Sequence, residues 1–424
     1  MSLIDRFLER AIRRGRLTVT FPGGRTASYG TPDAELADVA IRFADARALR
    51  QLLADPSLGA AEAYMDGRLI IERGDIRDFL NLATANNRWE EGRGTLDASR
   101  LRRAVDNVRF RIDRINMARR SKRNVAHHYD LSDRLYDLFL DADRQYSCAY
   151  FDDGTATQSL ESAQDAKKAH IAAKLAIEPG MRVLDIGCGW GGMALYLHAK
   201  TGADVCGITL SEEQLKVARC RAEMAGVDRH VRFELIDYRH MTGQFDRIVS
   251  VGMFEHVGPA HYRTFMRKCR ELLTPEGVML LHTIGRAGGP GVTDAFTAKY
   301  IFPGGYIPAL SEIVRANEGL RMFVTDIEVL RLHYAHTLAA WYDRVVAARE
   351  AIVAMYDERF YRMWTYYLAG SEVSFRHGGL VNYQLQFARD RHTLPITRDY
   401  MLAGERRLRG ADGQPSTSPS AFAL

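Results

Sequence analysis

Hydrophobic and polar positions in the C-terminal two thirds of the chain follow two alternating patterns. Short apolar runs bounded by turn residues indicate buried strands, and amphipathic segments of helical period lie between them. This order of strands and helices is typical of an α/β domain with a mostly parallel, doubly wound sheet. We expect its strands at 181–186, 203–208, 230–236, 246–251 and 277–284.

The alternation stops at residue 285. A long insertion, which we place at 285–330, begins there with "GRAGGPGVTDAFTAKYIFPGGYIPALSEI". We expect a further strand near 323–331 and two helices after Tyr334. The whole α/β domain is therefore predicted over 124–405.

The first 95 residues have a different pattern. An amphipathic start precedes "LTVTFPGGRTASYG", which predicts two short strands around a Pro-Gly-Gly turn. "DVAIRFAD" indicates another strand, and "ARALRQLLADPSLGAAEAYMDG" a helix pair broken at Pro56. No catalytic constellation is present, so we interpret residues 1–95 as a small α+β domain that is a scaffold or a lipid-binding module.

Basic residues are concentrated between the two predicted domains. From Arg100 to Arg123 ten Lys and Arg stand against two Asp, whereas the whole chain has a net charge of only +5. Apolar residues recur there at spacings of four and three, which predicts an amphipathic helix over 96–123. This helix either packs its apolar stripe on the protein's own core or faces anionic lipid headgroups. No aromatic stacking platform accompanies the charge, which argues against nucleic acid as a partner. The apolar stripe consists of Leu101, Val105, Val108, Ile112 and Ile115.

Composition narrows the class of protein. Hydrophobic residues make up 46% and charged residues 26% of the chain, ordinary values for a globular protein. No apolar run approaches the ~18 residues of a membrane span, and charges interrupt the N-terminal segment where a signal peptide would be apolar. The five cysteines show no CxxC spacing, which predicts a cytoplasmic protein with neither disulfides nor a metal site. The small, polar segment 410–424 is typical of a disordered tail.

A glycine-rich loop carries the first chemical signal. "VLDIGCGWGG", at 183–192, places a GxGxxG directly after a predicted strand, a pattern used for NAD and for S-adenosylmethionine. The NAD fingerprint needs a carboxylate at the end of the next strand, but that strand ends "VCGITLS" with Thr209. Asp185, inside the first strand end, would repel a pyrophosphate and suits a ligand bearing an ammonium group. The loop therefore favours S-adenosylmethionine.

Five motifs together identify a resemblance: "HHYDLSDRLYDLFLDADRQYSCAYFDDG", "VLDIGCGWGG", "GITLSEEQ", "VGMFEHVG" and "LLHTIG". Over roughly residues 124–400 the chain resembles the cyclopropane-fatty-acyl-phospholipid synthases and their mycolic-acid relatives. The resemblance implies a Rossmann-like class I methyltransferase fold. It also implies transfer of a methylene group from S-adenosylmethionine across a cis double bond of a phospholipid acyl chain, with the insertion at 285–330 binding that chain.

The resemblance implies cofactor contacts from four segments. Asp185 would lie near the methionine amine and Gln214 near the ribose. Tyr238 and Arg239 stand where the mycolic-acid relatives have a Trp-Glu pair, a departure on the adenine side. The full set is Tyr146, Ser147, Asp185, Gly187, Cys188, Gly189, Gly191, Thr209, Leu210, Gln214, Tyr238 and Arg239.

The resemblance also implies a bound bicarbonate as the catalytic base. Methylation of an alkene leaves a carbocation, which water would convert to an alcohol, so the site must be dry. Ser371 stands where some relatives have a cysteine, which excludes a covalent cysteine mechanism at that position. The residues that would hold the bicarbonate are Cys148, Glu255, His282 and Tyr334, with a backbone contact from Ile284.

Aromatic residues of the insertion and of "RFYRMWTYY" belong mainly to the core in this interpretation, with one or two lining the acyl channel. Two other readings stay open: a methyltransferase that makes methyl-branched or methylene acyl chains, and a lipid-binding protein with an inactive catalytic domain. The second would need a damaged site, but every expected residue is present. The aromatic residues assigned to the core or the acyl channel are Tyr300, Phe302, Tyr306, Tyr361, Trp364 and Tyr366.

A protein without a spanning segment must dock on the bilayer to reach a buried alkene. We therefore expect peripheral association with the anionic inner surface of the cytoplasmic membrane, and the sequence leaves a homodimer open. Expected lipid contacts are Arg102, Arg103, Arg109 and Arg120.

Overall fold

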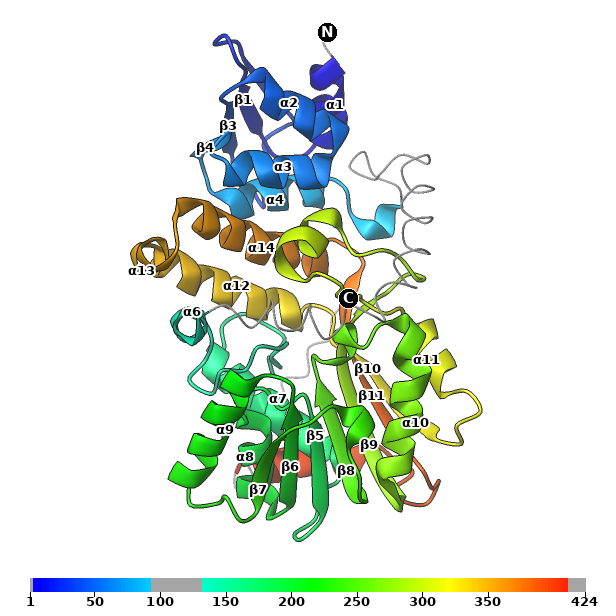
Figure 1. Ribbon diagram of the computed structural model, residues 1–424. Helices are drawn as coiled ribbons and strands as arrows, with labels where there is room; N and C mark the ends of the chain where they lie inside the picture. Colours follow the sequence, from blue (N-terminus) through cyan, green and yellow to red (C-terminus); the bar gives the residue numbers. More distant parts are fainter. Residues whose placement is uncertain (1–2, 93–131, 411–424) are drawn as a thin grey trace.

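The computed structural model describes residues 3–92 and 132–410 (Figure 1). The predicted basic helix at 96–123, with the four arginines expected to contact lipid, lies outside the described residues. So do all but the first residue of the predicted tail at 410–424. Among the helices within the described ranges, none combines the length and the apolar character needed to cross a membrane.

A seven-stranded sheet organises the larger unit, in the order β10-β11-β9-β8-β5-β6-β7. The pairs from β9 to β7 are parallel, whereas β11 runs antiparallel to both of its neighbours. The predicted α/β fold with a mostly parallel, doubly wound sheet is therefore confirmed. The strands are β5 (Arg182–Ile186), β6 (Asp204–Thr209), β7 (Val231–Leu235), β8 (Phe245–Val251), β9 (Leu273–Arg286), β10 (Phe323–Val329) and β11 (Leu380–Ala388).

Both faces of the sheet are buried at its five inner strands, as the continuous apolar runs predicted, whereas the edge strands β10 and β7 are largely exposed. Val183 packs in one layer with residues of α7, α8, α9 and α15, and Leu184 packs in the opposite layer with residues of α10 and α11. The two layers hold the strands rigidly, so residues at the strand ends have fixed positions. The helices are α7 (Leu160–Leu175), α8 (Gly192–Thr201), α9 (Glu212–Met224), α10 (Tyr262–Leu272), α11 (Leu310–Asn317) and α15 (Asp399–Leu408).

The N-terminal unit is α+β, as predicted, with a separate four-stranded sheet of order β2-β1-β3-β4. The predicted hairpin is present, and the helix pair breaks at Pro56, where Asp55 caps the second helix by accepting the Leu58 N–H. The sequence analysis did not predict β4 or α4. The elements are α1 (Leu3–Ala11), β1 (Leu17–Thr20), β2 (Thr26–Tyr29), β3 (Val39–Phe43), α2 (Ala46–Ala54), α3 (Pro56–Met65), β4 (Leu69–Arg73) and α4 (Ile76–Ala85).

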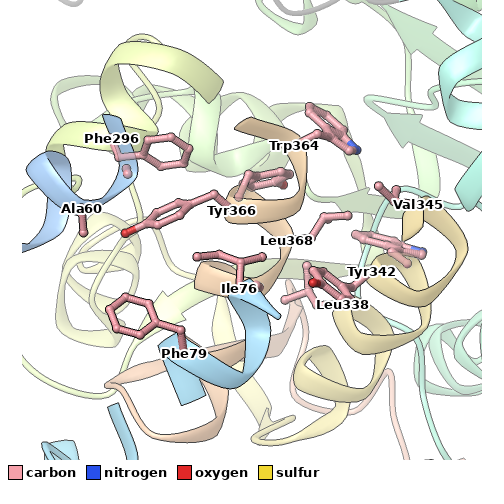
Figure 2. Packing of buried hydrophobic residues seen from close by; sticks show 14 of the residues in the cluster. Ala60, Ile76, Phe79, Phe296, Leu338, Tyr342, Val345, Trp364, Tyr366 and Leu368 are labelled. Carbon is pink, nitrogen blue, oxygen red and sulfur yellow. The ribbon is translucent and has the colours of Figure 1, made fainter. Parts of the chain in front are cut away.

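Two helices join the units. In Figure 1, α12 (His333–Ala347) and α14 (Glu358–Arg376) lie between the N-terminal unit and the large sheet. Their side chains pack against α3 and α4 in one hydrophobic cluster, part of which Figure 2 shows. Polar contacts reinforce the junction: the Tyr342 hydroxyl donates to Asp75 at 3.1 Å, and Arg77 pairs with Asp343 at 2.7 Å. The two units therefore share a core.

The C-terminal part holds more elements than the sequence analysis predicted. From Tyr334 on, the described residues form four α-helices rather than two, because α13 (Arg349–Met355) lies between α12 and α14 and α15 follows β11. The strand β11 was not predicted either. Its polar residues Gln384 and Gln386 are fully buried between two strands, where they bond to His282 and to the Lys174 carbonyl.

Candidate functional site

A cavity of about 710 Å³ opens at the carboxyl ends of the parallel strands, where α/β proteins place their ligands. The structure brings nearly all predicted site residues to its wall, from segments up to about two hundred residues apart. Gly191 is the exception: it caps α8, and a Cβ there would lie 2.7 Å from the Phe233 ring, so its need for glycine is one of packing. The residues that line the cavity are Tyr146, Ser147, Cys148, Asp185, Gly187, Cys188, Gly189, Thr209, Leu210, Gln214, Tyr238, Arg239, Glu255, His282, Ile284 and Tyr334.

The glycine-rich loop is held by the neighbouring strand. The N–H groups of Gly187 and Cys188 both donate to the Ile208 carbonyl, at 2.9 and 3.0 Å. Gly187 has φ 87°, and a Cβ there would lie 2.8 Å from the Met253 side chain. Only glycine fits this turn. The turn leads into α8, and its backbone remains accessible to a ligand.

Asp185 is buried beneath that loop. Its side chain has a relative exposure of 2%, and among the described residues its Oδ2 has no hydrogen-bond partner. Burial raises the pKa of this carboxyl to about 7, and the positive charge of Lys167 opposes that rise. An ammonium group of a ligand would supply the missing partner.

The wall of the cavity beyond the ends of β6 and β7 is polar, and its side chains are already held in place. Thr209 donates its hydroxyl to Gln214 Oε1 at 3.2 Å, and Ser211 caps α9 by accepting the Gln214 N–H. The Arg239 Nε donates to Asp237 Oδ1 at 2.9 Å, so the charge of this arginine is neutralised by Asp237. These contacts hold hydrogen-bonding groups at fixed positions on this part of the wall.

The sequence analysis missed Lys167, which holds two side chains of the cavity wall in place. This fully buried ammonium on α7 donates to Gln145 Oε1 at 2.5 Å and to Ser147 Oγ at 2.9 Å. Burial lowers its pKa to about 8. A signal was available, since Ala163 and Ile171, four residues to either side, place this lysine on an apolar helix face.

Glu255 and His282 form the opposite wall. Glu255, in the turn after β8, accepts the Ile284 N–H on Oε1 at 2.7 Å, and its buried Oε2 has no partner among the described residues. Burial raises the pKa of this carboxyl to about 7. The Ile284 N–H, expected to face the anion, is thus used to orient Glu255.

His282 is neutral and has a defined tautomer. Burial lowers its pKa well below the ordinary value. The Gln384 amide donates to Nδ1 at 3.1 Å, so the ring proton lies on Nε2, which has no partner in the part of the chain described. The ring therefore presents an N–H donor.

Cys148 and Tyr334 line the same part of the cavity. Burial raises the pKa of the Cys148 thiol and of the Tyr334 phenol, so both remain protonated. Tyr334 begins α12 and packs against Trp341 and Phe375, at ring distances of 5.9 and 4.8 Å. Together with Glu255 and His282, these two side chains can surround a small polar species. None of the four brings a positive charge.

Aromatic and apolar side chains make up much of the remaining wall. Of the six aromatic residues considered above, Phe302, Tyr306 and Tyr366 line the cavity, whereas the others lie outside its lining. Ser371 also lines it. Such a wall suits a hydrocarbon ligand.

Comparisons with known proteins agree with this geometry. The family model "Mycolic acid cyclopropane synthetase" matches residues 116–385, and a domain model of unknown function matches residues 3–89. The chain is 40% identical to the cyclopropane-fatty-acyl-phospholipid synthase of Escherichia coli (strain K12), over 83% of this chain and 88% of that protein.

Two further matches are named as a methyltransferase and a cyclopropane synthase. The tuberculostearic acid methyltransferase UfaA1 of Mycobacterium tuberculosis is 38% identical, over 64% of this chain and 66% of that protein. The crystal structure of mycolic acid cyclopropane synthase CmaA1, complexed with SAH and CTAB, superposes with a TM-score of 0.60 at 34% identity, over 63% of this chain and 98% of that chain.

Replacing Asp185 by Asn tests its predicted contact with the cofactor amine. Wild-type affinity for S-adenosylhomocysteine should fall as the pH drops below about 7, because protonation removes the negative charge that holds the ammonium. The Asn variant should bind ~10-fold more weakly above that pH and lose the pH dependence. Calorimetric titration across the pH range measures both effects. Equal affinity and an equal pH profile in the folded variant would refute the contact.

Replacing Lys167 by Met tests whether its charge acts on Asp185. Without the lysine the Asp185 pKa should rise, so the midpoint of the pH dependence of S-adenosylhomocysteine binding should move upward. Lys168→Met is the matched control, since Lys168 pairs with Asp143 at 2.8 Å and not with Asp185. A midpoint that stays in place in Lys167→Met, or moves equally in both variants, would contradict an electrostatic role.

Proposed function

Because the chain belongs to the mycolic acid cyclopropane synthetase family, we propose that it transfers a methylene group from S-adenosylmethionine to a cis double bond of phospholipid acyl chains. The protein is a methyltransferase in fold and family. One observation carries the finer assignment: a single apolar cavity contains both the glycine loop with Asp185 and the unpartnered atoms of Glu255 and His282.

The chemistry requires such a chamber. The alkene attacks the sulfonium methyl group, a C–C bond forms, and the C–S bond breaks to release the thioether. The carbocation left on the acyl chain loses a proton from the new methyl group as the ring closes. Apolar walls keep water from the cation, and aromatic faces nearby stabilise it by about 0.5–2 kcal/mol each.

The residues of the chain bind and orient the two substrates. Asp185 accepts the ammonium group of the methionine part, and Gln214, held by Thr209, lies ready for the ribose hydroxyls. Lys167 fixes Ser147 and Gln145 behind the sulfonium. Because binding these groups orients the methyl donor relative to the alkene, the protein lowers the entropic part of the barrier.

The donor set fits a bicarbonate ion, which would supply the base for the released proton when bound. His282 and Tyr334 each present a protonated donor, Cys148 lies beside them with its thiol donating to the Ala149 carbonyl at 3.3 Å, and none of the three is charged. An anion is compatible with Glu255 only when that carboxyl is protonated, and burial brings its pKa to about 7. Glu255 would then donate from Oε2 while the Ile284 N–H holds Oε1.

A second product class follows from the same cation. If the proton left from a neighbouring chain carbon, a methyl-branched alkene would result. If a hydride first shifted from the methylated carbon to the cation, loss of a proton from the methyl group would give a methylene chain. The similarity to a tuberculostearic acid methyltransferase makes this the principal alternative.

Association with an anionic membrane surface remains part of the proposal. The concentration of Lys and Arg between residues 100 and 123 supports it, since each basic residue near such a surface contributes about 1 kcal/mol. That segment lies outside the described residues. A homodimer and a location at the inner surface of the cytoplasmic membrane are proposed on the same footing.

Trideuteromethyl S-adenosylmethionine and unsaturated phospholipid vesicles test the proposed reaction. The acyl product should gain a CD₂ group, lose its alkene and carry no branch by mass spectrometry and NMR. A methyl branch or a retained double bond would establish the alternative. No transfer to any acyl chain would reject the proposed function.

Replacing Glu255 by Ala tests the proposed base site. Ala removes the carboxyl group that would donate to the anion, so we expect turnover to fall by roughly 10²-fold or more with unchanged S-adenosylhomocysteine affinity. His282→Ala and Tyr334→Phe should likewise slow turnover, and added bicarbonate should partly restore variants that bind the anion weakly.

The matched control is Glu276→Ala at an exposed glutamate near the other end of β9, which should leave turnover unchanged. Wild-type turnover should depend on bicarbonate and should need more of it as the pH rises above about 7, because the ionised Glu255 repels the anion. A wild-type rate that is unchanged after thorough bicarbonate removal would contradict this base.

A further inference from the structure

The cavity does not end at the catalytic residues. It continues between α14 and the N-terminal unit, into the space enclosed by α1, α3 and α4. A segment matched only by a domain model of unknown function thus forms part of the substrate cavity. The lining residues from this unit include Leu8, Ala11, Leu52, Ala60, Leu80 and Ala83.

Tyr366 marks the passage between the two parts. It projects from α14, its hydroxyl donates to the Ser57 carbonyl of α3 at 3.2 Å, and its ring lies 4.9 Å from Phe296 of the insertion. Figure 2 shows Tyr366 and Phe296 beside Ala60 of α3, with Phe79 of α4 nearby. The insertion, α14 and the N-terminal unit therefore meet around the cavity.

The two parts of the cavity differ in polarity. Among the described residues of the N-terminal unit, those that line it carry no charge. Thr84 is satisfied locally, since its hydroxyl donates to the Leu80 carbonyl at 2.7 Å. The charged and titratable lining, including Arg286, Asp294 and His261, comes from the catalytic unit. A headgroup or ester would leave its polar atoms without partners in the N-terminal part, whereas a hydrocarbon end would not.

We propose that the N-terminal unit receives the methyl end of the acyl chain and limits the length of tail that can lie beyond the double bond. This inference rests on the proposed function. Small side chains at Ala60 and Ala83 leave the room that the tail occupies, and Leu80 and Phe79 bound it. Each methylene that leaves water for this space strengthens binding about fourfold, so closing the space excludes longer tails.

Two opposite substitutions on α4 test the proposal. Ala83→Leu fills the space, and Leu80→Ala enlarges it. The substrates are phosphatidylglycerols, dispersed in detergent, whose cis double bond stays at one distance from the carboxyl group while the methyl-side tail lengthens by two carbons at a time. A second series varies the carboxyl side instead. Ala85→Leu is the matched control, since Ala85 lies on the same helix and does not line the cavity.

We expect Ala83→Leu to make kcat/KM fall more steeply as the tail lengthens, with a loss of ~15-fold for each two-carbon step beyond its limit. Leu80→Ala should shift the preference toward longer tails, a gain that misfolding cannot produce. The carboxyl-side series should be unaffected, and Ala85→Leu should match the wild type.

Unchanged tail preference in both folded variants, or a change confined to the carboxyl-side series, would overturn the proposal. If Ala83→Leu does not fold, Leu80→Ala decides alone. Absence of cyclopropane product with wild-type protein on every substrate would instead reject the proposed function, so the two failures are distinguishable.

Discussion

The structure depends on holding buried polar atoms unpaired, among the described residues, at the wall of a largely apolar cavity. Asp185, Glu255 and His282 each have such an atom within the described part of the chain. Each costs about 1–3 kcal/mol in the protein without its ligands, so the surrounding fold must be rigid enough to hold it. The buried sheet does this, because its strand ends carry all three residues between two packed layers. The cost is recovered when ligands supply the missing partners.

A shared core extends this enclosure beyond the sheet. The helices α12 and α14 pack on one side against the N-terminal unit and contribute Tyr334, Tyr366 and Ser371 to the cavity on the other. The same two helices therefore enclose the reactive region and hold the N-terminal unit in position. An isolated α/β domain would leave the apolar wall of α14 exposed to water. In this chain the walls of the cavity therefore come from both units.

The sequence predicted the fold class and the residues around the cavity because both have local signals. Buried strands appear as apolar runs, and the glycine loop and "MFEHVG" motif directly follow strand ends. Other features depend on tertiary contacts. In β11, Gln384 and Gln386 alternate with apolar residues as in a half-exposed strand, but both are buried. The position of Lys167 on an apolar helix face indicates burial, but its partners Gln145 and Ser147 are known only from the fold. The continuation of the cavity beneath α4 has no local pattern, since it forms only when α14 meets the N-terminal unit.

Exclusion of water from the carbocation is the central claim, and turnover in water labelled with heavy oxygen tests it most directly. Wild-type protein, S-adenosylmethionine and unsaturated phospholipid are incubated, and the acyl products are analysed by mass spectrometry. We expect cyclopropane product without labelled hydroxyl groups. A substantial fraction of labelled, methylated alcohol from the wild-type protein would show that water reaches the cation and would contradict this account.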